Sequence, residues 1–227
     1  MPSLETPVSP TTELYLAFEI DGAKASSASE AVLRAALAAV PVSSLLLRAK
    51  GGAALTAQAA KPLVELAQKR GVAALVAADC ALARIVKADG VHVPWSKTIV
   101  ADFKAARGEL GERYIVGADA GRSRHEAMEM GEAGADYIAF GIPPHVEDRS
   151  TAEDRQIDLV AWWSEIFEIP CVAGDVAAPA HARDLAFAGA DFVSVTLSDD
   201  MTAADAVTQM EAMRAALNDA ANVGTPA

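Results

Sequence analysis

Eight short apolar runs, each followed by a segment with helical spacing, most constrain what this chain can fold into. The first run covers 14–20 and the second 44–48, with helical spacing over 29–40 between them. Six more pairs follow up to residue 221, without a change of composition that would separate two domains. Strands that alternate with helices form a parallel sheet. Eight such units predict an α/β fold, a single (βα)8 barrel of the TIM type.

One segment interrupts the alternation. Residues 142–158 are charged and lack periodicity, so we expect a long loop between a strand at 137–141 and a helix at 159–168. Long loops in compact domains are often functional. We assign the barrel to 13–221, a flexible segment rich in Pro, Ser and Thr to 1–12, and a flexible tail to 222–227.

The charge balance argues against nucleic-acid and membrane partners. The net charge is −12 and the pI is near 4.7, whereas phosphate surfaces attract clustered Lys and Arg. No run reaches the roughly 20 apolar residues that span a bilayer, and the amino terminus lacks a signal-peptide pattern. Cys80 and Cys171 have neither CxxC nor zinc spacing, so we expect free thiols in a reducing cytoplasm. The sequence indicates no clear interface, so it leaves open whether the protein forms a homo-oligomer.

The carboxyl ends of the strands carry the candidate site, because barrel active sites lie there. Arg48 and Lys50 are two residues apart at the end of a strand run, so we expect them to point the same way and hold a phosphate. Gly174 and Ser198 follow the seventh and eighth strands, where barrels bind phosphate on backbone N–H groups. Asp79 opens a helix, and both a helix N-cap and a metal ligand remain open for it.

The other strand ends are also polar. They present Glu19, Asp21, His92, Trp95, Asp119, Gly141, His145, Asp175 and Thr196. Asp89, Asp136 and Asp191 instead precede strands, at the face of a barrel that serves stability, and we expect them to be structural.

The order of the motifs resembles the thiamine phosphate synthase family, over roughly residues 14 to 215. The residues that carry the likeness are Leu47-Arg48-Ala49-Lys50, Asp79, Ala88-Asp89-Gly90-Val91-His92, Ile115-Val116-Gly117, the run from Gly134 to Gly141, the run from Ile169 to Gly174, and the run from Ala188 to Val195.

This resemblance implies an enzyme that joins a pyrimidine pyrophosphate to a thiazole phosphate, both small phosphorylated molecules. Magnesium and cationic side chains hold the pyrophosphate as it leaves, so the protein mainly stabilises charge and positions the reactants. By resemblance, Arg48 and Lys50 hold the pyrophosphate, Asp79 binds Mg²⁺, and Gly174 opens the thiazole phosphate site. Gly141 and Ser198 complete the expected substrate-binding set.

Several positions depart from the family pattern. They are Leu46 for a Gln, Ala78 for the Asn of an Asn-Asp pair, Pro94–Lys97 without the second magnesium carboxylate, Ala118–Arg122 for a Ser-Thr-His segment, His145–Arg149 for a Thr-x-Thr-Lys loop, and Gly174-Asp175 for a glycine pair. An acid after the seventh strand would repel a phosphate. Two negative charges ~4 Å apart in a partly desolvated site repel each other by a few kcal/mol.

Two alternatives follow from these departures. The first is the related thiazole tautomerase, which needs an acid or base instead of a metal, with His145 as the proton carrier. The second is a non-catalytic barrel that binds a small ligand or a partner. Its contacts would be the Glu147-Asp148 loop and the Trp162-Trp163 pair, although both tryptophans also suit a helix packed on the barrel.

Overall fold

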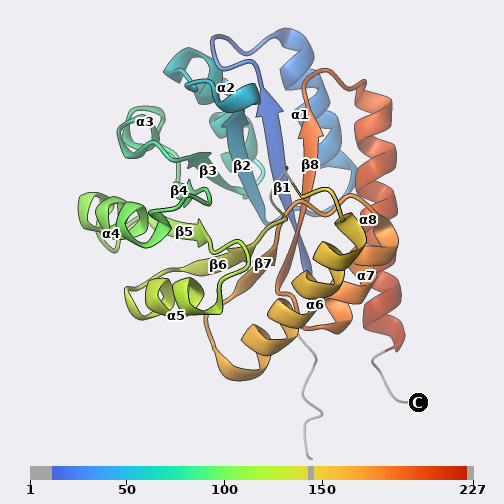
Figure 1. The fold of residues 1–227 in the computed structure, drawn as a ribbon. Coiled ribbons are helices and arrows are strands. Elements are labelled where there is room, and N and C mark those ends of the chain that lie inside the picture. The colour runs from blue at the N-terminus through green and yellow to red at the C-terminus, as the bar shows by residue number, and fades with distance from the viewer. Residues whose placement is uncertain (1–11, 143–145, 224–227) are drawn as a thin grey trace, which may run out of the picture.

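The chain forms a closed barrel of parallel strands surrounded by helices (Figure 1), as seen in a computed structural model that describes residues 12–142 and 146–223. The strands follow one another around the barrel in chain order, β1 to β8. They are β1 (Glu13–Ile20), β2 (Ser44–Ala49), β3 (Ala73–Ala77), β4 (Gly90–Val93), β5 (Ile115–Asp119), β6 (Tyr137–Phe140), β7 (Cys171–Ala173) and β8 (Phe192–Ser198). The helices are α1 (Ser27–Ala39), α2 (Ala57–Gln68), α3 (Cys80–Val86), α4 (Ile99–Leu110), α5 (Arg124–Glu132), α6 (Arg149–Ile166), α7 (Pro179–Phe187) and α8 (Ala203–Val223). The predicted (βα)8 barrel is confirmed.

Strand alternation divides the apolar residues into two cores. The outward residues of β1, such as Leu14 and Phe18, belong to the large core between the barrel and its helices. A second, smaller core contains Tyr15, Leu46, Leu75, Tyr137, Ala139 and Val172. These side chains come from β1, β2, β3, β6 and β7 and fill the barrel interior, as in other barrels of this type. A ligand must therefore bind above them, at an end of the barrel.

Three aspartates repeat one structural role at the amino ends of the strands. Asp89 accepts a hydrogen bond from the Ala74 N–H at 2.7 Å, and Asp136 accepts one from the Val116 N–H at 2.7 Å. Asp191 accepts one from the Cys171 N–H at 2.8 Å. Each carboxylate thus satisfies a backbone donor of the preceding strand, which agrees with the structural role that the sequence indicated.

The loop predicted for 142–158 is wrong over most of its length, because α6 begins at Arg149. Asp148 caps this helix by accepting a hydrogen bond from the Thr151 N–H at 3.1 Å. The buried residues of α6 are Ala152, Gln156, Leu159, Val160 and Trp163. The spacing is helical, but one position of the buried stripe is a glutamine and charged residues surround it, so the first turns show no apolar period.

The barrel begins with β1 and ends with α8, and the predicted domain boundaries stay a prediction. Thr12 is buried and donates a hydrogen bond to the Ala190 carbonyl at 2.8 Å, and α8 continues to Val223. The remaining residues of the segments predicted to be flexible, 1–11 and 224–227, lie outside the described residues. Among the described residues, no helix is both long enough and apolar enough to cross a membrane.

The barrel interior leaves no room for a side chain at Gly117 on β5. A Cβ there would stand 2.0 Å from the Cζ atom of Tyr137. We therefore predict that Gly117→Ala lowers the free energy of unfolding by about 1–3 kcal/mol, the usual cost of overpacking a core. Urea denaturation measures this effect.

Gly108 provides the matched control, because a Cβ at this position in α4 meets no atom within 4 Å. Gly108→Ala should raise stability by about 0.5–1 kcal/mol, since alanine is the better helix former. Equal stability of Gly117→Ala and the wild type would contradict the packing described for the barrel interior.

Candidate functional site

Arg48 is the central side chain at the carboxyl end of the barrel. It lies at the end of β2, in register with Glu19 of β1. Its Nε atom is 2.9 Å from Glu19 Oε1, an ion pair in which the N–H does not point along a hydrogen bond. Its Nη2 atom is 3.3 Å from Asp175 Oδ1 and donates a hydrogen bond to Thr196 Oγ1 at 3.2 Å. One guanidinium thus links β1, β8 and the loop after β7 across the barrel mouth.

Lys50 does not share this environment. Strand β2 ends at Ala49 and Lys50 begins a tight 3-10 turn, in which Gly51 has a φ of +62°. The strand alternation that would align Lys50 with Arg48 therefore stops before Lys50. Instead, Lys50 forms ion pairs with Asp199 and Asp200. The predicted common pocket of the two cations is not formed.

The Lys50 ion pairs line a separate cavity of about 600 Å³ at the barrel rim. The other lining residues are Asp21, Gly22, Lys24, Ser26 and Ala53. Burial by itself would lower the pKa of Lys50, but the hydrogen bonds to Asp199 and Asp200 outweigh it and raise that pKa. Lys50 is thus a protonated amine whose positive charge Asp199 and Asp200 already balance.

Two carboxylates meet over Gly141, just after β6. A Cβ on Gly141 would lie 2.6 Å from Asp119 Oδ2 and 3.2 Å from Asp175 Oδ2. The other oxygen of Asp119, Oδ1, accepts hydrogen bonds from the N–H groups of Gly121 at 2.7 Å and Gly141 at 3.1 Å. Position 141 therefore requires a glycine, whose backbone has no side chain between the two carboxylates.

The pKa of Asp119 is raised to about 6. Burial is the main cause, the two backbone hydrogen bonds act against it, and the nearby charge of Asp175 adds to the rise. A carboxyl group with a pKa near the operating pH can both donate and accept a proton. Asp119 therefore has the electrostatic character of an acid–base group.

A polar chain runs below this layer, from the barrel centre to β4. Tyr15 and Tyr137 hydroxyls are 3.0 Å apart, and the Tyr137 hydroxyl is 2.9 Å from His92 Nδ1. Burial, together with the positive charge of Arg48, lowers the pKa of His92 to about 4. These two contacts join His92, Tyr137 and Tyr15 in one chain of hydrogen bonds. His92 is thus a neutral, packed residue facing the barrel interior.

The glycine-lined side of the mouth is held by a buried pair from α6 and α7. The Gln156 amide N–H group donates to the Gly174 carbonyl at 2.8 Å and also to the Phe140 carbonyl. Gln156 Oε1 lies 2.7 Å from His181 Nε2, which donates to it. Gln156 is 2 % exposed and His181 7 %. Because buried polar groups need partners, this pair fixes the ends of β6 and β7, and with them Gly141 and Gly174.

Ser198 ends β8, in register with Glu19 of β1. Its hydroxyl accepts a hydrogen bond from the Asp200 N–H at 3.3 Å. The phosphate-binding role predicted for Gly174 and Ser198 stays a prediction.

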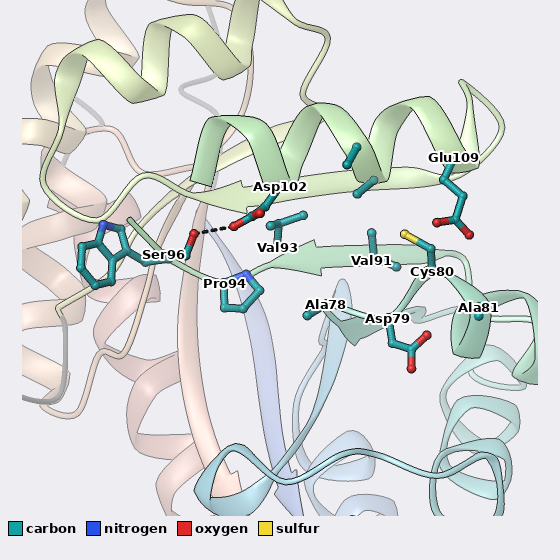
Figure 2. A pocket seen from close by; sticks show the side chains of 13 residues that line it. Ala78, Asp79, Cys80, Ala81, Val91, Val93, Pro94, Ser96, Asp102 and Glu109 are labelled. Atoms are coloured by element: carbon teal, nitrogen blue, oxygen red, sulfur yellow. Dashed lines mark hydrogen bonds between the residues drawn. The ribbon is translucent and has the colours of Figure 1, made fainter. Parts of the chain in front are cut away.

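Asp79 acts as the N-cap of α3, accepting a hydrogen bond from the Leu82 N–H at 2.8 Å. It lines a groove of about 510 Å³ between α3, β4 and α4, on the outer side of the barrel. Figure 2 shows Asp79 and Asp102 on different sides of this groove, with Asp102 bonded to Ser96. No group of three or more potential ligands that could hold a metal occurs among the residues 12–142 and 146–223. The role of Asp79 as a metal ligand stays a prediction.

His145, the predicted proton carrier of the tautomerase alternative, lies outside the described residues. Sequence reasoning placed Glu19, Asp119 and Asp175 among the polar strand ends without giving them a catalytic or binding role, and it did not include Tyr15 or Tyr137. Strand parity could have indicated Glu19 and Asp119, which have the inward phase at strand ends. The partners of Lys50, Asp199 and Asp200, follow a strand end and carried no periodic signal.

Comparisons with known proteins agree with this architecture. The family model described as thiamine monophosphate synthase matches residues 17–198. A thiamine-phosphate synthase of Hyphomonas neptunium is 35% identical over 82% of this chain and 85% of that protein. One of Erythrobacter litoralis is 42% identical, over 62% of this chain and 65% of that protein.

A solved thiamine phosphate pyrophosphorylase from Pyrococcus furiosus shares the fold. Its TM-score is 0.69 at 23% sequence identity, and the alignment covers 91% of this chain and 96% of that chain. With the family match spanning nearly all of the barrel, the chain belongs to the thiamine monophosphate synthase family.

Proposed function

We propose that this chain is a transferase of the thiamine phosphate synthase type, which joins a pyrimidine pyrophosphate to a thiazole phosphate. The observation that carries the proposal is the family match over 17–198, and it is supported by the Arg48 guanidinium at the barrel mouth, to which the family resemblance assigns the pyrophosphate. Two relatives that bear the synthase name match at 35% and 42% identity. The free thiols Cys80 and Cys171 support a reducing, cytoplasmic location.

In this reaction the residues of the chain mainly stabilise charge. The guanidinium of Arg48 offers parallel N–H donors that suit a phosphate group. As pyrophosphate leaves the pyrimidine methylene, its negative charge grows, so a fixed cation at the mouth favours the transition state over the ground state. Magnesium supplies additional charge neutralisation when bound, according to the family resemblance. We assign no step to it, since no group of three or more potential metal ligands occurs among the described residues.

A condensation assay with both phosphorylated substrates, with and without Mg²⁺, tests this function. The wild type should form thiamine phosphate, and Arg48→Ala should lower kcat/KM by about 10²-fold or more, the usual effect of removing a transition-state charge contact. Arg84→Ala is the matched control, because Arg84 pairs with Glu109 at the outer surface and should leave the rate unchanged. Absence of product from the folded wild type under both conditions would remove the synthase proposal.

A second function, isomerisation of a thiazole by proton transfer, is favoured by Asp119. This tautomerase reaction needs an acid–base group and no metal, and Asp119 combines a pKa of about 6 with one oxygen, Oδ2, directed over Gly141. Turnover of a thiazole substrate alone, lost in Asp119→Asn, would favour this reaction over condensation.

The raised pKa of Asp119 also makes a prediction about stability that needs no substrate. Between its ordinary value of 3.8 and about 6, the folded state keeps the proton that the unfolded state loses, so this group's contribution to stability falls as the pH rises. The Asp119→Asn variant has no titrating group at this position, so its stability lacks this dependence on pH. Relative to the wild type, the variant should therefore gain about 1–2 kcal/mol between pH 4 and pH 7.

Urea denaturation of both proteins at the two pH values measures the difference. The comparison cancels the titration of all other groups as far as the mutation leaves them unperturbed. A stability difference between variant and wild type that does not change with pH would contradict the raised pKa of Asp119.

A further inference from the structure

We propose that Asp175 occupies, in the free protein, the place on Arg48 that the anionic group of a ligand takes, and so sets the affinity of the site for phosphate-bearing ligands. The inference rests on the proposed function in one respect, that Arg48 is the anion-binding cation. It adds an internal competitor, supplied by the loop after β7.

The contact itself is the first argument. Asp175 Oδ1 lies 3.3 Å from Arg48 Nη2, and both side chains remain partly exposed, at 31% for Arg48 and 34% for Asp175. The same nitrogen reaches Thr196, and Nε faces Glu19. An anion arriving over Gly141 therefore finds the Nη2 group of Arg48 already engaged by Asp175 and Thr196.

The backbone at Asp175 is the second argument. Asp175 has a φ of +56°, a left-handed conformation that glycine adopts without strain and that is uncommon for other residues. Ala78 and Lys87 are the other non-glycine residues with positive φ in the part of the chain that the structure describes. A carboxylate is thus carried at a backbone position that favours glycine, and its side chain ends on Arg48.

Electrostatics gives the third argument. Asp175 Oδ2 and Asp119 Oδ2 both face the same point above Gly141, so the mouth carries two acids on the side opposite Glu19. A phosphate brought to Arg48 while Asp175 stays in place would be repelled by it. However, the ion pair has a single, long N–O contact that is open to solvent, and such pairs are weak. A multiply charged anion can therefore displace Asp175, but with reduced affinity.

Titration calorimetry with inorganic pyrophosphate tests the proposal at low salt and pH 8. Asp175→Gly suits the left-handed backbone and removes the competing carboxylate, and Asp175→Asn keeps the shape while removing the charge. Both variants should bind pyrophosphate at least about tenfold more tightly than the wild type. Adding Arg48→Ala to Asp175→Gly should abolish the gain. Asp184→Asn, which removes one negative charge on α7 beside Arg183, should bind like the wild type.

The outcomes separate this proposal from the synthase function. Calorimetry reads pyrophosphate binding without turnover, so a wild type that forms no thiamine phosphate leaves the prediction for Asp175 intact. Equal affinity of the wild type and the two Asp175 variants would overturn it. So would a gain that persists without Arg48, since the anion would then bind elsewhere, for example at Lys50. If Asp175→Gly does not fold, as judged by circular dichroism, Asp175→Asn gives the same test.

Discussion

The ion pairs of Arg48 across the barrel mouth are the interaction on which the rest of the site depends. A guanidinium at the end of β2 reaches Glu19 on β1, Thr196 on β8 and Asp175 after β7. Without this cation, the carboxylates of Glu19 and Asp175 would lose the positive charge that both contact. Arg48 therefore balances the charge of the acids at the mouth and also supplies the positive charge that would bind an anion. An N–H group that is bonded to an internal carboxylate binds an incoming anion less strongly. Competition between internal carboxylates and an incoming anion follows directly from that arrangement.

The surrounding structure keeps this layer in place from below and from the side. Below it, the Tyr15–Tyr137–His92 chain fills the barrel interior, where burial and the charge of Arg48 lower the pKa of His92. From the side, Gln156 and His181 fix the carbonyls at the ends of β6 and β7. Both supports are buried polar networks, which are costly when only partly satisfied and rigid when complete. The mouth is thus set on rigid elements, while the residues that contact a ligand stay accessible.

Sequence patterns predicted the barrel well, because hydrophobic periodicity and strand–helix alternation are local and repeat eight times. They also predicted the structural role of Asp89, Asp136 and Asp191. Two kinds of information were out of reach. The first turns of helix α6 were hidden because Gln156 takes a buried position that serves β6 and β7 rather than the core. The acids Asp175, Asp199 and Asp200, which pair with Arg48 and Lys50, lie more than a hundred residues away in the chain, and no local pattern encodes which acid meets which cation. Strand parity placed Arg48 correctly but not Lys50, since β2 ends one residue before it.

The central claim, that Arg48 is an anion-binding cation held in check by Asp175, is tested most directly by a crystal structure of the wild-type protein soaked in a high concentration of pyrophosphate. The account predicts phosphate oxygens within hydrogen-bond distance of the Arg48 guanidinium, with the Asp175 side chain rotated away from it. An Arg48–Asp175 pair that stays intact while pyrophosphate binds only at the Lys50 rim, or nowhere on the barrel mouth, would contradict the claim.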